Sequence, residues 1–299
     1  MDIRHFRYFL TVAEEGHITR AAERLGMQQP PLSQQIKAME TELNVQLFRR
    51  LPRGVELTEA GRALLPEARA IISGVEEAVA KTKRTARGEE GALSVGFTSS
   101  APFHPFIPQV IRRYRERFPK VELILEEAGT AEMAEALKAE RLDAAFVRSP
   151  VADRTGLAIH ALVQEPMLLA VPQDHRLATA TAPVGLQQLA DEPFILYRRT
   201  AGQGLYNAIM QACRSAGFEP VIAQQAPRIV STLNLVAAGL GVTIAPASLR
   251  QLGMDGVVFR ELVPDISLKA PIWIAARTTS HSAAAREFVT LARQMAGEA

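Results

Sequence analysis

The sequence predicts a mixed fold in three successive parts: a small α-helical head with a β-hairpin, one long helix, and a larger α/β region. Closely spaced amphipathic helical patterns near the N-terminus indicate the head. A heptad-like apolar stripe after residue 58 indicates the long helix. Short apolar runs alternate with amphipathic segments over roughly the last 200 residues, which favours α/β folding with largely parallel sheets.

The head is marked by a helix, a tight turn and a second helix over about residues 18–37. Gly26 between the helices suits a left-handed helix end. The apolar side chains of the first helix recur on one helical face; they are Ile18, Ala21, Ala22 and Leu25. Those of the second helix, which are expected to face inward, are Leu32, Ile36, Met39 and Leu43. This spacing predicts a helix-turn-helix, although an ordinary helical hairpin with a solvated polar face would show it too.

The outer face of the second helix carries short polar groups, and two prolines stand where a helix start tolerates them. Amide, hydroxyl and ammonium groups are the types that reach base edges and phosphates in a DNA major groove. The residues predicted to contact DNA from this segment are Gln28, Gln29, Pro30, Pro31, Ser33, Gln34 and Lys37.

Two neighbouring segments favour a DNA-reading head over a plain helix pair. An amphipathic helix over about residues 3–15 supplies the apolar surface that a three-helix unit needs. After Leu43, two short apolar runs flank a Pro-Arg-Gly turn, which predicts a β-hairpin wing with Arg53 at its tip, near a phosphate backbone. Residues 1–62 hold nine basic and eight acidic side chains, so DNA affinity must depend on where the arginines lie.

These segments together resemble the winged helix-turn-helix of LysR-type transcriptional regulators. The resemblance rests on RHFRYFLTVAEEGHITRAAERLGMQQPPLSQQIKAMETELNVQLFRR followed by RGVELTEAG, without gaps over the first 62 or so residues. The double proline of QQPPLSQQI is similar to the subgroup that controls aromatic-acid and chlorocatechol degradation. The resemblance implies a ligand-responsive regulator, not an enzyme, whose partners are double-stranded promoter DNA, a small anionic effector and RNA polymerase.

A long helix is predicted to follow the head, which spans residues 1–58, and to cover residues 59–87. Thr58 is a plausible N-cap. The heptad stripe is too narrow for a globular core and indicates a partner helix; its members are Leu64, Ala68, Ile71, Val75, Ala78 and Thr82. The stripe would also suit packing on the same chain. The resemblance implies a homodimer through this helix and a homotetramer overall. The run RGEEG at 87–91 predicts a flexible hinge.

Residues 88–299 form the predicted effector-binding domain. The strands are expected at Leu93–Phe97, 121–125, Ala144–Val147, Met167–Val171, Phe194–Tyr197, Val242–Ala245, Val257–Phe259 and Ile272–Ala275. The helices are expected at 106–118, 132–140, 204–215, 229–238 and 282–295. The resemblance implies two lobes like a periplasmic binding protein, lobe one at about 90–163 and 268–299 and lobe two at about 164–267.

Ligands of such folds bind at the carboxyl ends of strands and between lobes. Hydroxyl and guanidinium groups there suit anion recognition. The predicted effector-binding residues are Ser99, Ser100, Thr130, Arg148, Tyr197, Arg198 and Arg199. Ser99 and Thr130 would also serve as helix caps, and Arg148 and Arg199 as surface ion-pair formers. The resemblance implies an acidic effector, either an aromatic acid or a ring-cleavage product, but the double arginine departs from the relatives, so the effector's identity does not transfer.

Several function classes are disfavoured by the same sequence. Cys213 is the only cysteine, which excludes an intrachain disulfide and a Cys-rich metal site and indicates a buried inert thiol. The histidines lack metal-ligand spacing, and neither a metal nor a cofactor is expected. Ser99, His104 and Asp143 lack the motif of a catalytic serine. A stand-alone solute-binding protein would share the two lobes, but it would need a secretion signal and no head. No apolar stretch is long enough for export or a membrane span, so a cytoplasmic protein is expected.

Overall fold

The computed structural model describes residues 1–148, 151–198, 203–263 and 268–298. Of the predicted site residues, Arg199 lies outside this described part. The chain separates into two compact units, Met1–Arg84 and Thr85–Ala299.

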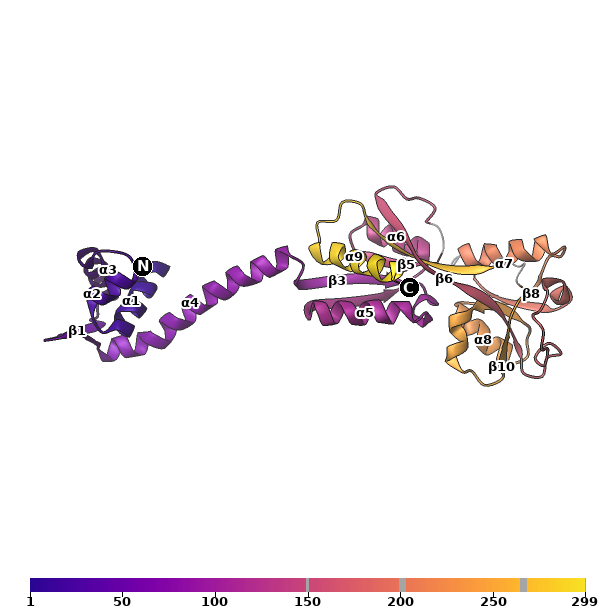
Figure 1. Ribbon diagram of the computed structural model, residues 1–299, viewed down its shortest axis with the longest axis horizontal. Coiled ribbons are helices and arrows are strands. Elements are labelled where there is room, and N and C mark those ends of the chain that lie inside the picture. The colour runs from indigo at the N-terminus through magenta and orange to yellow at the C-terminus, as the bar shows by residue number, and fades with distance from the viewer. Residues whose placement is uncertain (149–150, 199–202, 264–267, 299) are drawn as a thin grey trace. The chain divides into compact units, whose positions relative to one another are not determined.

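The first unit is a three-helix head with a β-hairpin (Figure 1). Its elements are α1 (Ile3–Glu15), α2 (Ile18–Arg24), α3 (Gln29–Leu43), β1 (Phe48–Leu51) and β2 (Gly54–Leu57). Phe9, Leu32 and Met39 are fully buried in its core. The predicted winged helix-turn-helix is therefore confirmed. The inward position predicted for Leu43 is wrong: this side chain is 37% exposed, because no further helical turn follows it to cover it.

The wing is attached to the helices by backbone contacts that leave no room for a side chain. The Val55 N–H donates to the Gly16 carbonyl at 2.9 Å. Gly54 has a φ of +121°, and a Cβ there would lie 2.3 Å from the same Gly16 oxygen. At the start of β1, the N–H groups of Leu47 and Phe48 donate hydrogen bonds of 2.8 and 3.1 Å to the carboxylate of Glu40, which lies on α3. Glycine at position 54 and the α3 carboxylate thus fix the orientation of the hairpin.

A long helix, α4 (Glu59–Ala86), follows the wing. The Thr58 hydroxyl accepts from the Gly61 N–H at 3.0 Å, as expected of an N-cap. The first half of α4 packs on its own head, because Ala68 belongs to the head core and Leu64 lies against it. These two members of the heptad stripe therefore contact the same chain.

The main sheet of the second unit has the strand order β10-β6-β11-β5-β3-β4, with β9 also paired to β6 (Figure 1). The strands are β3 (Glu90–Phe97), β4 (Lys120–Glu127), β5 (Ala144–Val147), β6 (Leu157–Pro172), β9 (Thr243–Pro246), β10 (Val257–Arg260) and β11 (Lys269–Arg277). β3 runs parallel to β4 and β5, but β11 is antiparallel to β5 and β6. The predicted largely parallel sheet is wrong here, because β6 leaves lobe one and β11 returns to it, so these neighbours run in opposite directions.

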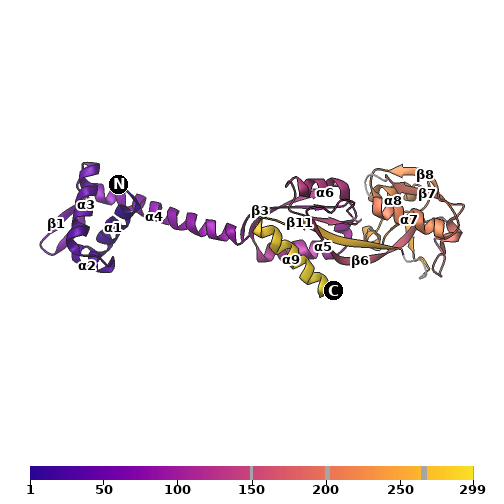
Figure 2. The same cartoon turned by 90° about the horizontal axis from the view of Figure 1, so that it is seen from above.

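Helices cover both faces of the strands of lobe one. They are α5 (Phe106–Arg117), α6 (Thr130–Lys138) and α9 (Ala283–Gly297). Phe146 of β5 packs with Phe288 of α9, whereas its neighbours Ala145 and Val147 belong to the core under α6. Because alternate strand residues face opposite sides of a sheet, α6 lies on the face opposite α9. Figure 2 shows this layering, with α6 on one side of β11 and α9 on the other.

Lobe two has its own apolar core, built by the second half of β6, β9 and β10 with four further elements. These are β7 (Pro193–Tyr197), α7 (Gln203–Ser215), β8 (Val221–Ala226) and α8 (Ile229–Ala237). β7 and β8 pair in parallel. Strand β8 escaped sequence prediction because two glutamines interrupt the apolar pattern of VIAQQA and Val221 is exposed. Cys213 is fully buried in this core, in agreement with the sequence.

The hinge predicted over 87–91 is wrong in its second half. Glu90 and Gly91 begin β3 and pair with Lys120 and Val121 of β4. Pairing with the backbone of β4 makes these residues part of a strand, and the polar sequence RGEEG carries no local signal for that pairing.

Candidate functional site

The face of α3 that was predicted to read DNA is open in the structure. Gln28 is the N-cap in extended conformation, and its side chain makes no capping hydrogen bond. Of the predicted contact residues, Ser33 is half-buried. The others are exposed; they are Gln28, Gln29, Pro30, Pro31, Gln34 and Lys37. The opposite face carries the buried Leu32, Ile36 and Met39. The helix therefore presents a continuous polar face that packing within the head does not use.

The wing carries three arginines in different surroundings. Arg53 lies in the turn between β1 and β2 and is exposed, as are Arg49 and Arg50. Arg49 forms an ion pair with Glu56 on the facing strand, at the register position directly opposite. Its charge is therefore partly neutralised, whereas Arg53 at the tip has no ion-pair partner among the residues that the structure describes.

Beyond the turns that pack on the head, α4 exposes an apolar stripe. Ile71, Val75 and Val79 are 41%, 42% and 49% exposed, spaced four residues apart on one helical face. Large apolar side chains in a continuous row on a helix mark a surface that packs on another helix. The sequence prediction included Ile71 and Val75 but not Val79, because a strict heptad places Ala78 in that turn instead.

In the second unit, the predicted effector residues gather at strand ends. Thr98, Ser99 and Ser100 follow β3, Arg148 follows β5, and Thr130 begins α6 after β4. Because β3 is parallel to both β4 and β5, these positions share one edge of the sheet. Ser99 is half-buried and the other four residues are buried. Tyr197 is buried at the end of β7, and Arg198 beside it is exposed.

The alternative structural roles of Ser99, Thr130 and Arg148 do not match this arrangement. The N-cap of α6 is Gly129 rather than Thr130. The N-cap of the short helix η1 (Ala101–Phe103) is Ser100 rather than Ser99. Arg148 is 3% exposed, so it is not a surface ion-pair former.

Arg148 forms a buried ion pair that sequence reasoning missed. Its guanidinium lies 2.6 Å from the Glu165 carboxylate and donates to the Ser100 and Ala270 carbonyls at 3.2 Å each. Glu165 also accepts from the backbone N–H of Ser248, which belongs to η4 (Ala247–Leu252) of lobe two, at 2.5 Å. The signal for Glu165 was an acidic residue within the apolar run of β6.

Burial controls the ionisation of the groups around this pair. Desolvation lowers the pKa of the Arg148 guanidinium, against the opposing charge of Glu165. Desolvation likewise lowers the pKa of His104; the Glu165 charge opposes this and the Arg148 charge adds to it. Burial raises the pKa of the Tyr197 hydroxyl. The site therefore favours a neutral imidazole and a neutral phenol.

Two buried polar atoms at this sheet edge lack a hydrogen-bond partner within the described part of the chain: Thr98 Oγ1 and Arg148 Nε. They come from adjacent strand ends, since the Thr98 N–H donates to the Phe146 carbonyl at 3.2 Å. Buried polar groups are nearly always satisfied in native proteins. Both atoms can donate a hydrogen bond, and an acceptor such as a carboxylate would satisfy both.

The hypothetical triad is not assembled. Asp143 accepts from the Ser94 N–H at 3.0 Å and pairs with Arg277 at 3.3 Å. Asp143 thus lies beside the middle of β3, whereas Ser99 follows the end of that strand, beyond Phe97. Among the residues described, no three His, Cys, Asp or Glu side chains gather as a metal site. No helix in the described ranges is both long and apolar enough to cross a membrane.

Comparison with known proteins covers both units. Residues 3–62 match the family described as "Bacterial regulatory helix-turn-helix protein, lysR family", and residues 86–297 match "LysR substrate binding domain". The transcriptional regulator AlsR of Bacillus subtilis is 38% identical, over 97% of this chain and 94% of its own length. BudR of Raoultella terrigena is also 38% identical, over 97% of this chain and all of its own.

The solved structure of full-length CbnR complexed with its target DNA resembles the chain with a TM-score of 0.86 and 29% identity. The match covers 99% of this chain and 100% of CbnR. AlsR and BudR are transcriptional regulators and not enzymes. Neither is named for aromatic-acid or chlorocatechol degradation, so that subgroup stays a prediction.

Proposed function

The chain belongs to the LysR family of bacterial transcriptional regulators, and on that premise we propose how its parts divide the work. Regulators of this family bind promoter DNA and small-molecule effectors. Residues 1–58 form the DNA-binding head, 59–87 the dimerisation helix and 88–299 the effector-binding domain. Because its target is promoter DNA, the protein works in the cytoplasm.

We propose that α3 enters the major groove and the wing contacts the backbone. The exposed amide of Gln34 reads base edges, with Ser33 beside it, and Lys37 binds phosphate. Gln28, Gln29 and the two prolines position the start of the helix at the groove. The free Arg53 adds a phosphate contact that is independent of sequence. The unused polar face of α3 supports this assignment.

Assembly in this proposal uses the exposed stripe of α4. Two copies of Ile71, Val75 and Val79 would bury each other in an α4–α4 contact and present two heads to one promoter. Contacts between effector domains would then join two dimers into a homotetramer, which controls transcription together with RNA polymerase.

The effector site is proposed at the sheet edge of Ser99, Ser100, Thr130 and Arg148. The observation that carries it is the pair of unsatisfied buried atoms, Thr98 Oγ1 and Arg148 Nε. A small organic anion would supply the missing acceptor. Because Glu165 already neutralises Arg148, directional hydrogen bonds rather than net charge would hold the ligand. Tyr197, Arg198 and Arg199 would contribute from lobe two.

The effector class is proposed to be an aromatic acid or a ring-cleavage product. Its binding would favour one arrangement of the lobes only through differential affinity for the two arrangements. A thermal-shift panel of benzoate, muconate and non-aromatic acids such as acetate is the first screen. Stabilisation by acetate alone would contradict the aromatic class but not the site.

The site itself is tested by calorimetric titration of the best acid against Ser99→Ala. Loss of one hydrogen bond to a charged ligand should raise the dissociation constant about ten-fold or more. The matched control is Ser94→Ala, within β3 and away from the strand end that Ser99 follows. Unchanged affinity in Ser99→Ala, with the melting temperature lowered, would make Ser99 structural and remove it from the site.

A further inference from the structure

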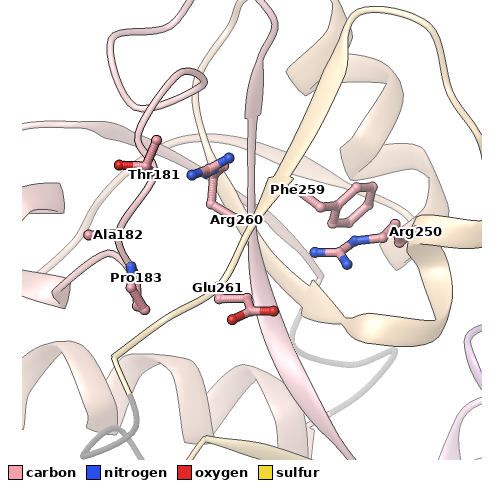
Figure 3. A pocket seen from close by; sticks show the side chains of 7 residues that line it. All are labelled: Thr181, Ala182, Pro183, Arg250, Phe259, Arg260 and Glu261. Carbon is pink, nitrogen blue, oxygen red and sulfur yellow. The ribbon is translucent and has the colours of Figure 1, made fainter.

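A polar pocket lies in lobe two, lined by none of the residues of the sheet edge just described. Its volume is about 270 Å³. It is formed by the loop 181–183, the end of β10 and η4, which contribute Thr181, Arg260 and Arg250 respectively (Figure 3). The size suits a small metabolite rather than a drug-sized molecule.

The two arginines of this pocket stand out by their lack of acidic partners. Neither Arg250 nor Arg260 forms an ion pair with any residue that the structure describes. Two other exposed arginines of lobe two do have acidic partners: Arg214 pairs with Glu219 at 2.7 Å and Arg176 with Glu192 at 2.8 Å. The Nε of Arg260 is also buried, and no acceptor within the described ranges satisfies it. Water cannot easily reach a buried donor, so this atom is an unsatisfied group rather than a merely solvated one.

We propose that this pocket binds a small carboxylate that also carries a hydroxyl or ammonium group. Guanidinium groups bind carboxylates through paired hydrogen bonds, and the Thr181 hydroxyl adds a donor. Glu261 lines the same pocket and has no ionic partner among the described residues. Its negative charge disfavours the binding of a dianion such as phosphate. Its oxygens can accept a hydrogen bond from a donor group of the ligand. An amino acid satisfies both signs of charge, and a hydroxy acid offers Glu261 a neutral hydrogen-bond donor.

The pocket is connected to the proposed effector site through η4. Arg250 lies on this short helix between Ser248 and Gln251. Ser248 donates to Glu165, the partner of Arg148, and Gln251 donates to the Phe103 carbonyl in lobe one. A ligand held by Arg250 therefore acts on the helix that ties lobe two to lobe one. Coupling through this helix would be reciprocal: each ligand would change the affinity for the other by the same factor.

Saturation-transfer NMR on the full-length protein at low ionic strength tests the proposal with acetate, glycolate and glycine as probes. Glycolate and glycine are expected to bind more tightly than acetate. Arg250→Gln and Arg260→Gln should each raise the dissociation constant of both about ten-fold or more. The matched control, Arg214→Gln, removes an exposed arginine of the same lobe outside the pocket and should leave it unchanged. Arg250 is exposed, so its variant remains informative even where Arg260→Gln fails to fold.

Glu261→Gln provides a second signature that general destabilisation would not produce. It should weaken the binding of glycine, whose ammonium loses an opposing charge. It should strengthen the binding of inorganic phosphate, which no longer faces a repelling charge, as followed by ³¹P line broadening. Absence of binding by all probes, or equal affinity in the arginine variants and wild type, would overturn the proposal. Loss of probe binding in Ser99→Ala but not in Arg250→Gln would also overturn it, since the probes would then occupy the effector site.

Discussion

The guanidinium of Arg148 and the carboxylate of Glu165 lie 2.6 Å apart, with side chains only 3% and 7% exposed. The pair joins the end of β5 to β6, the strand that leads from lobe one into lobe two. Through Ser248 it also reaches η4. A single ion pair thus connects the strand ends proposed to bind the effector with the segment that links the lobes.

Removing one partner of this pair should destabilise the second unit strongly. Glu165→Ala leaves a buried guanidinium without its counter-charge, which typically costs about 3–5 kcal/mol of unfolding free energy. The exposed pair Arg214–Glu219 offers the matched control, and Glu219→Ala should cost less than about 1 kcal/mol. Urea unfolding followed by fluorescence of Trp273, the only tryptophan, reports on this unit. Equal midpoints for the two variants would show that the buried pair contributes little to stability.

Gln34→Ala should reduce operator binding more than binding to random DNA, because the exposed amide is proposed to read bases. Arg53→Ala should weaken both kinds of binding similarly and reduce the salt slope by about one unit, because it removes one phosphate contact. Gel-shift titrations at several salt concentrations distinguish the two patterns. Intact operator preference in Gln34→Ala would place the reading face elsewhere.

Val75→Glu should dissociate the dimer and weaken DNA binding with it. The change would place an unpaired charge in the middle of the α4 contact. Ser73→Glu is the matched control, because Ser73 is exposed and lies on the other side of the same helix. Light scattering measures the outcome. A native oligomer for Val75→Glu would exclude this stripe from the interface.

Cys213 should react very slowly with thiol reagents in the native protein. Burial raises the pKa of this thiol to about 11, which is about two units above its ordinary value. The thiolate fraction at pH 8 is therefore roughly a hundred-fold lower, and lack of access slows the reaction further. An Ellman assay with and without denaturant measures both rates. Comparable rates in the two conditions would mean that lobe two opens readily.

Much of the head follows from sequence alone because its signals are local. Gly26, the double proline and the apolar spacing around Leu32 and Ile36 each act within a few residues, and they predict the helices and their faces. The strand ends that carry Ser99 and Arg148 could be found in the same way, from short apolar runs followed by polar residues.

Only the tertiary structure shows those strand directions and contacts that depend on residues far apart in the chain. The antiparallel run of β11 follows from the chain returning between the lobes, and Leu64 and Ala68 pack on their own head. Glu165 pairs with Arg148 across 17 residues and with Ser248 across 83, distances over which no periodicity in the sequence carries information. The sequence alone determined which groups are present at the sheet edge. Folding decided that one of them, Arg148, is already neutralised.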